Sequence, residues 1–308
     1  MDLLPDIQLV RDTSLADVDP RTLRRSAARG ELIRAHRGAF VDAVDWAVLS
    51  PQSRYRTRIL AAARASRTRP VVSHVSAAVL HGAPLVGRIP DVVHVVSTIS
   101  AGTRTEHGFR KHAAASPGGV VELDGVPVTA LVRTLADVAL SEPFLTAVAI
   151  LDWAFRQHAI TAEDVVDDLA RRGVVRSRRR AELALAFADP RSGSPGESLS
   201  RVRIHELGFP APELQCPFSD SRGQIGVVDF WWPASRTVGE FDGVAKYIRE
   251  EYAQGRSVAE IVLDEKRREN RLRALGLTVV RWEWADAWGG TALRALLLEA
   301  GLVSTRRR

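Results

Sequence analysis

The chain has 308 residues, which predicts about two domains, and its composition of 45% apolar and 26% charged residues argues against disorder. The net charge of +6 fits a polyanionic partner, although a chain rich in arginine and alanine can also reflect genomic base composition. The single cysteine, Cys216, excludes an intrachain disulfide and a multi-cysteine zinc site.

The opening segment, MDLLPDIQLVRD, has acidic residues where a secretory signal has a cationic region. No uncharged apolar run approaches the length of a transmembrane helix, so we expect a cytoplasmic protein with no membrane partner. No phosphate-binding glycine motif occurs, and no nucleotide cofactor is expected.

Residues 1–48 predict a winged-helix head. Asp19-Pro20 is a favourable helix start, and the basic segment RTLRRSAARGE that follows breaks near Gly30. The next segment, ELIRAHRGAFVDA, has the pattern of a short hairpin with its turn at residues 36–38. A basic helix followed by a small hairpin is the usual ending of a winged helix-turn-helix.

Residues 49–190 alternate helical and strand patterns, which predicts an α/β middle domain. Its strands include the apolar run DVVHVVS, and its end is the glycine-, proline- and serine-rich break DPRSGSPG. His74 and His81 lie seven residues apart and share a helix face. Without a third ligand, a packed helix explains them better than a metal site does.

Residues 196–308 predict a third domain with the order α-β-β-β-α-β-α, which gives an overall α/β (α+β) fold class. The first helix is ESLSRVRIHELG, and the strands are PELQCPFSD, IGVVDFWWP, RTVGEFDG and LTVVRWEW. The charged helix DEKRRENRLRALG precedes the last strand.

Four carboxylates occupy this third domain at positions that suit a metal. Asp229 lies inside an apolar strand, where an unpartnered carboxylate is costly to bury. Glu240 and Asp242 lie two residues apart on the next strand and so share one face, with Phe241 on the other. Glu197 lies in the first turn of the preceding helix. Such a set predicts Mg²⁺ or Mn²⁺ held against a phosphodiester.

Each carboxylate also has a structural explanation when it is taken alone. Glu197 can complement the helix dipole or pair with Arg201, and Asp229 can pair with a buried arginine. Asp242-Gly243 is an ordinary turn signal. The combination on adjacent strands favours the metal site.

The segments GESLSRVRIHELGFPAPELQ, GVVDFWWP, TVGEFDG and DEKRRENRLRALGLTVVRWEW resemble the PD-(D/E)xK nuclease superfamily, in its branch near the very-short-patch-repair endonucleases. The resemblance covers nearly all of residues 196–290 and implies a restriction-endonuclease-like αβββαβ domain. It implies that Glu197 is the helix carboxylate, Asp229 the central metal ligand and Glu240 the second acidic ligand. It also implies catalytic roles at Asp242 and at a nearby lysine.

The chain departs from the usual superfamily pattern at Asp242, which stands where a lysine normally orients the attacking water. Lys246 or Lys266 could supply that cation from another element. In this fold the charged helix flanks the site, so Arg267 and Arg271 are expected to contact phosphates.

The segments ELIRAHRGAFV, RYRTRILAAARAS, SHVSAAVLHGAPLVGRIPDVVHVV and GVPVTALVRTLADVAL resemble the AbiEi antitoxins of type IV toxin–antitoxin systems. This resemblance covers roughly residues 10–150 and implies a DNA partner and, with it, a cognate toxin. It implies major-groove contacts from the helix and phosphate contacts from the wing. The residues concerned are Arg21, Arg24 and Arg25 on the helix and Arg34 and Arg37 on the wing.

Two functions follow. The first is a metal-dependent DNA endonuclease targeted by the winged helix, which retention of Glu197, Asp229 and Glu240 favours. The second is a non-catalytic DNA-binding regulator, which the departure at Asp242 favours. The sequence leaves the oligomeric state open.

Overall fold

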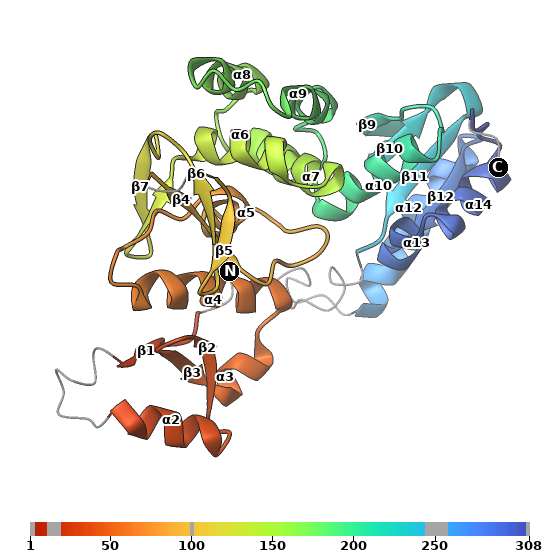
Figure 1. The fold of residues 1–308 in the computed structure, drawn as a ribbon. Coiled ribbons are helices and arrows are strands. Elements are labelled where there is room, and N and C mark those ends of the chain that lie inside the picture. Colours follow the sequence, from red (N-terminus) through yellow and green to blue (C-terminus); the bar gives the residue numbers. More distant parts are fainter. Residues whose placement is uncertain (1–3, 11–19, 99–101, 244–257, 306–308) are drawn as a thin grey trace. The chain divides into compact units, whose positions relative to one another are not determined.

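The computed structural model describes residues 4–10, 20–98, 102–243 and 258–305, and the chain forms two compact units (Figure 1). Unit 1 is Met1–Leu151 with Ile160–Phe187, and unit 2 is Asp152–Ala159 with Ala188–Arg308. Both units combine helices with small sheets, so the predicted α/β class is confirmed. Within the described ranges, no helix has the length and apolar character needed to span a bilayer.

The head of unit 1 is a helix followed by a hairpin, in the predicted order. Its elements are β1 (Gln8–Leu9), α2 (Pro20–Ala28), β2 (Leu32–His36), β3 (Ala39–Asp42) and α3 (Ala43–Val48), with the sheet order β1-β3-β2. Leu23, Leu32 and Phe40 form a small core between the helix and the hairpin. Gly38 turns the hairpin with a φ of +81°, a conformation that glycine adopts at little cost.

The remainder of unit 1 surrounds two small sheets. Its elements are α4 (Pro51–Ala65), α5 (His74–Leu80), β4 (Val93–Ser97), β5 (Arg104–Glu106), β6 (Phe109–Ala113), β7 (Val120–Leu123), β8 (Val126–Thr129), α6 (Leu131–Ser141), α7 (Phe144–Gln157), α8 (Ala162–Arg171) and α9 (Arg178–Phe187). Strands β4 and β6 are parallel, β5 is antiparallel to β6, and β7 pairs with β8. Ile59, Leu60, Val95 and Val128 are buried in its core.

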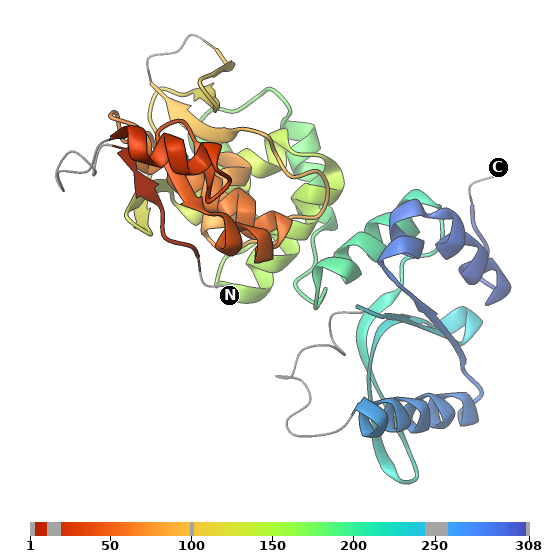
Figure 2. The ribbon, with the colours of Figure 1, turned by 90° about the horizontal axis from the view of Figure 1, so that it is seen from below.

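Unit 2 contains one four-stranded sheet. Its elements follow the predicted order, except that a short helix precedes the third strand and two helices, not one, follow the last strand. Its elements are α10 (Pro195–Glu206), β9 (Glu213–Asp220), β10 (Gly223–Trp232), the short helix η1 (Pro233–Ser235), β11 (Thr237–Phe241), α12 (Val258–Ala274), β12 (Thr278–Trp282), α13 (Trp284–Gly289) and α14 (Thr291–Glu299). The order is β12-β11-β10-β9, with β9, β10 and β11 antiparallel and β12 parallel to β11. Helix α12 covers one face, and α10, α13 and α14 cover the other (Figure 2).

Two glycines allow this packing. A Cβ on Gly196 of α10 would overlap the ring of Phe241, and a Cβ on Gly239 of β11 would overlap the indole of Trp282. Because both positions lack a side chain, α10 and the aromatic rings lie directly against the sheet.

The end of helix α7 belongs to unit 2, a boundary that the sequence does not predict. Asp152 is fully buried and accepts hydrogen bonds from Ser198 Oγ at 2.7 Å, Arg201 Nη1 at 2.8 Å and Asp189 N at 2.7 Å. A buried carboxylate requires such partners. This network fixes residues 152–159 to the start of α10.

Candidate functional site

Asp229 and Glu240 are neighbours across two antiparallel strands. Phe230 of β10 pairs with Gly239 of β11, so the next residues along the two strands, Asp229 and Glu240, lie opposite each other. The Asp229 Oδ2 atom also accepts a hydrogen bond of 2.9 Å from the backbone N–H of Phe241. The carboxylate is therefore oriented by the strand that carries the other two predicted ligands.

Gln215 joins Asp229 to Glu197. Its Nε2 atom donates to Asp229 Oδ1 at 3.1 Å and to Glu197 Oε2 at 2.9 Å. The Gln215 backbone has a φ of +53°, which costs a non-glycine residue about 1 kcal/mol and is common at functional sites. Glu197 is 5% exposed and also accepts from Gly193 N at 2.7 Å, so it orders the turn before α10.

Glu240 is buried between two arginines. Arg268 Nη1 of α12 lies 2.6 Å from Glu240 Oε1, and Arg281 Nη2 of β12 lies 2.6 Å from Oε2. The direction of the Arg268 contact is poor for a hydrogen bond, so Oε1 is buried with an unused acceptor. Arg281 reaches Glu240 because β12 is parallel to β11 and the two residues are paired in register.

Arg281 is surrounded by acidic side chains. Besides Glu240, it contacts Glu265 at 2.8 Å, Asp242 at 3.4 Å and Glu269 at 3.5 Å. Phe241 packs on the opposite face, against Trp284. Glu240 and Asp242 therefore share one face, as the two-residue period predicts. The described carboxylates of this cluster outnumber its guanidinium groups.

The pKa values reflect this burial and crowding. Burial raises the pKa of the Glu240 carboxyl, Arg268 and Arg281 oppose that shift, and the charge of Asp229 adds to it. Burial likewise raises the pKa of Asp242, with Arg281 opposing and Asp229 adding. The three carboxylates are thus close enough to repel one another, and a cation would relieve that repulsion.

The predicted convergence of four carboxylates on one cation is not observed. In the described ranges, no three His, Cys, Asp or Glu side chains are grouped so as to hold a metal ion. Arg268 and Arg281 already neutralise Glu240, and Glu197 faces Gly193 and Gln215.

A smaller ligand set does fit a divalent ion. Mg²⁺ commonly uses only one or two carboxylates and fills its other positions with water and substrate phosphate. Asp229 makes no ion pair within the described ranges, and Asp242 is held only by the long Arg281 contact. These two side chains suit Mg²⁺ or Mn²⁺ bound together with a phosphate.

The predicted basic residues of α12 face different ways. Lys266 and Arg267 are exposed, and Arg267 pairs with Asp264 at 3.3 Å. Arg271 instead forms an ion pair of 2.7 Å with Asp220 in the β9–β10 turn. The hydrogen bond from Arg271 lowers the pKa of Asp220 to about 2. Arg271 therefore stabilises this turn, and the structure does not bring Lys266 to the carboxylates. Lys246 lies outside the described residues.

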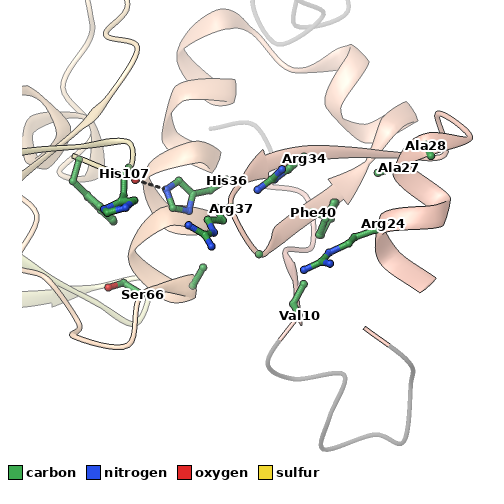
Figure 3. A pocket seen from close by; sticks show the side chains of 13 residues that line it. Val10, Arg24, Ala27, Ala28, Arg34, His36, Arg37, Phe40, Ser66 and His107 are labelled. Carbon is green, nitrogen blue, oxygen red and sulfur yellow. Dashed lines mark hydrogen bonds between the residues drawn. The ribbon is translucent and has the colours of Figure 1, made fainter. Parts of the chain in front are cut away.

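The five predicted DNA-contacting arginines of the head are all exposed. They are Arg21, Arg24 and Arg25 on α2, Arg34 on β2 and Arg37 in the hairpin turn. Three of them, Arg24, Arg34 and Arg37, surround a single pocket (Figure 3).

A histidine cluster lies in the middle of unit 1. His74 does not associate with His81, which contacts Thr129 O, but stacks on His112 with ring centroids 3.5 Å apart. His112 Nε2 lies 3.2 Å from His94 Nδ1. Burial lowers the pKa of His94 to about 3 and that of His112 to about 4, so both rings are neutral. Among the described residues these rings do not form a group that could hold a metal ion, and their stacking is a packing contact.

Three residues of the carboxylate cluster were not identified as site residues from the sequence. Gln215 is a polar residue within a strand pattern, and Arg281 is a charged residue between Val280 and Trp282 in an apolar strand. Either irregularity could have drawn attention to the position. Arg268 carries no such signal, because it is one of several arginines on a charged helix.

No protein-family model matches the chain. The chain is similar to the uncharacterized proteins Rv2248 and MT2308 from two strains of Mycobacterium tuberculosis, with 35% identity over 162 residues. Each alignment covers 51% of this chain and 55% of the relative, so the chain spans about half the length of the curated relatives it matches.

Proposed function

We propose that the chain is a metal-dependent DNA endonuclease, with the phosphodiester hydrolysed at the carboxylate cluster of unit 2 and duplex DNA bound by the head of unit 1. The observation that carries the proposal is the position of Asp229. It lies opposite Glu240, is oriented by Gln215 and Phe241 N, and makes no ion pair with any described arginine. Asp229 is half-buried and is held by two hydrogen bonds without a described counter-ion, so its negative charge is left for a ligand.

In this proposal Asp229 and Asp242 hold the metal, which when bound offsets phosphate charge and lowers the pKa of a coordinated water. Gln215 fixes the Asp229 carboxylate, and Glu197 fixes Gln215. Arg268 and Arg281 keep Glu240 in place and limit the repulsion among the carboxylates. These groups are carried by the four strands of one sheet and by helices α10 and α12, which favours a rigid site.

The test is nicking of supercoiled, single-stranded and mismatched DNA by the purified chain in Mg²⁺ or Mn²⁺, compared with chelator. Asp229→Asn should reduce cleavage by about a hundredfold or more and leave DNA binding intact. Asp264→Asn is the matched control, because Asp264 is an exposed carboxylate on α12 outside the cluster. Equal activity of the wild type and Asp229→Asn would refute the proposed site.

The two candidate lysines give a second comparison. Lys266 is exposed on α12 and makes no described contact with the carboxylates. We therefore expect Lys266→Met to retain cleavage and Lys246→Met to lose it. The reverse result would assign the water-orienting cation to α12.

A second function, that of a non-catalytic DNA-binding regulator resembling an antitoxin, is favoured by one observation. Arg268 and Arg281 already supply Glu240 with the positive charge that a metal would bring. Wild-type protein that shifts duplex DNA in gels but nicks no substrate in either metal would support the regulator. A cognate toxin would then be sought by co-purification.

A further inference from the structure

The pocket in unit 1 lies between helix α2, the β2–β3 hairpin, the end of α4 and the β5–β6 turn (Figure 3). Its volume is about 1070 Å³, which is sufficient for a small organic molecule. The wall includes His36, whose Nε2 lies 3.3 Å from His107 O and whose ring packs against Phe109. The pocket therefore has fixed walls on both the hairpin side and the β5–β6 side.

The charged side chains that line the pocket are all basic. Arg24 comes from α2, Arg34 from β2 and Arg37 from the hairpin turn, and Figure 3 shows all three at the same pocket. None of them makes an ion pair or side-chain hydrogen bond with any residue that the structure describes, and the pocket lining contains no aspartate or glutamate. Arginines elsewhere in unit 1, such as Arg56 and Arg133, are paired with carboxylates. Three unpaired guanidinium groups form a strong attractor for an anion.

The floor of the pocket is apolar. Phe40 is 3% exposed and Phe109 is 9% exposed, and Val10 and Ala27 complete this surface. The Nδ1 atom of His36 is also buried without a hydrogen-bond partner. An inorganic anion would satisfy the arginines but would fill only a small part of the pocket, whose volume is about 1070 Å³. A ligand that uses the whole pocket needs both an acidic group and an apolar body.

We infer that this pocket binds a small organic anion, whose carboxylate, sulfonate or phosphate is held by Arg24, Arg34 and Arg37 and whose apolar part lies against the apolar lining around Val10 and Ala27. If the proposed DNA-binding function holds, the bound anion competes with DNA phosphates for the same arginines. The head then releases DNA when the ligand is present.

Binding is tested on the full chain without DNA, by calorimetric titration with anilinonaphthalene sulfonate. Its uncharged analogue phenylnaphthylamine is the paired probe. The sulfonate should bind at one site and at least about tenfold more tightly than the neutral probe, because charge-assisted hydrogen bonds supply the difference. Inorganic phosphate at millimolar concentration should weaken sulfonate binding. Equal affinities for the two probes would overturn the inference.

Variants locate the site. Arg34→Gln with Arg37→Gln should weaken sulfonate binding by about tenfold or more and leave the melting temperature unchanged, because both side chains are exposed. Arg67→Gln is the matched control, since Arg67 is an exposed arginine one residue beyond the lining residue Ser66. Phe40→Ala, by contrast, removes a core side chain and is avoided. An unchanged affinity in the double variant would also overturn the inference.

A separate gel-shift arm tests competition. The sulfonate should displace duplex DNA from the wild type at the concentration at which it fills the pocket, and the neutral probe should not. If the chain binds the sulfonate through the arginines but does not bind DNA, the proposed DNA-binding function is refuted and the inferred ligand site still stands. Sulfonate binding with undisturbed DNA binding would show that the two sites do not compete.

Discussion

Both units bury groups that titrate, and they avoid the cost of buried charge in different ways. In unit 1, His74, His94 and His112 lie together and stay neutral, because burial lowers their pKa values below the physiological range. In unit 2, Glu240 is buried next to two guanidinium groups, which favour its charged form and oppose the rise that burial causes in its pKa. A histidine becomes neutral by losing a proton, which needs little free energy near neutral pH. A carboxyl group becomes neutral by taking up a proton, which is costly at a pH far above its ordinary pKa.

The difference has a functional meaning. The stacked histidine rings carry no charge, so their burial needs no counter-ion. In unit 2 the described carboxylates around Arg281 outnumber the guanidinium groups that contact them. Under the proposed function, this excess of carboxylates favours a bound cation. The pocket of Arg24, Arg34 and Arg37 has the opposite charge and, for the same reason, favours an anion.

The largest effect is expected from a substitution that disturbs the packing of α10 against β11, the strand that carries Glu240. A Cβ at Gly196 would overlap the Phe241 ring, so Gly196→Ala should force α10 away from β11 and destabilise unit 2 by about 3 kcal/mol. Gly289→Ala, where no atom lies within 4 Å of the added Cβ, is the control and should be nearly neutral. Hydrogen exchange of peptides from each unit measures the effect. Loss of protection in unit 1 instead would contradict the assignment of Gly196 to unit 2.

A smaller effect is expected when the counter-ion of Glu240 is removed. Arg281→Gln should lower the free energy of unfolding by about 2 kcal/mol at pH 7, less than for a fully buried pair because the Arg281 side chain is 23% exposed. Without Arg281 the already raised pKa of Glu240 rises further. The folded state then gains relative stability as the carboxyl is protonated, so the defect should be largest at neutral pH and disappear below about pH 4.5.

Urea unfolding at several pH values checks this prediction. Arg267→Gln is the control, because the Arg267 side chain is 68% exposed and pairs only with Asp264 among the described residues. Its effect should be negligible at every pH. A pH-independent defect in Arg281→Gln would mean that lost packing, and not the charge of Glu240, causes the destabilisation.

The sequence predicts the local features of the carboxylate cluster and misses its long-range pairs. The two-residue period of a strand correctly separates Glu240 and Asp242 from Phe241. The pairing of Arg281 with Glu240 depends on a parallel register between strands about forty residues apart, which no local pattern specifies.

Helix rotation and domain boundaries were missed for a similar reason. A basic helix segment does not reveal which of its charged residues face the sheet. Lys266 is predicted as the cation of the site but is exposed, and Arg271, which is predicted to contact phosphate, pairs with Asp220 in the β9–β10 turn. Residues 152–159 join unit 2 through contacts of Asp152 with residues far along the chain. Local composition at the break DPRSGSPG cannot show that.

The response of unit 1 to acid separates the two units most directly. Its change for one histidine and one pH unit is the smallest expected effect, and it accumulates over several pH units. The unfolded pKa of histidine is near 6.5, and the folded values of His94 and His112 are about 3 and about 4. Stability from these neutral rings is therefore fully present above pH 6.5 and is lost as the pH falls toward the folded values, because only the unfolded chain takes up protons. The loss should be about 1 kcal/mol per pH unit for each histidine.

The groups facing the histidines support this direction. Arg110 lowers the pKa of both His94 and His112, and Asp137, which opposes it at His112, is itself engaged by Arg133 and Arg172. Replacing His94 and His112 together by Asn should lower stability at neutral pH and flatten its slope between pH 6.5 and 4, so that the deficit shrinks as the pH falls. The exposed His107→Asn should leave the slope unchanged. Urea unfolding at several pH values gives the slope for each variant, and hydrogen exchange of β4 and β6 peptides shows whether the change lies in unit 1. An unaltered slope in the double variant would show that the buried rings are not the groups that couple folding to pH in unit 1.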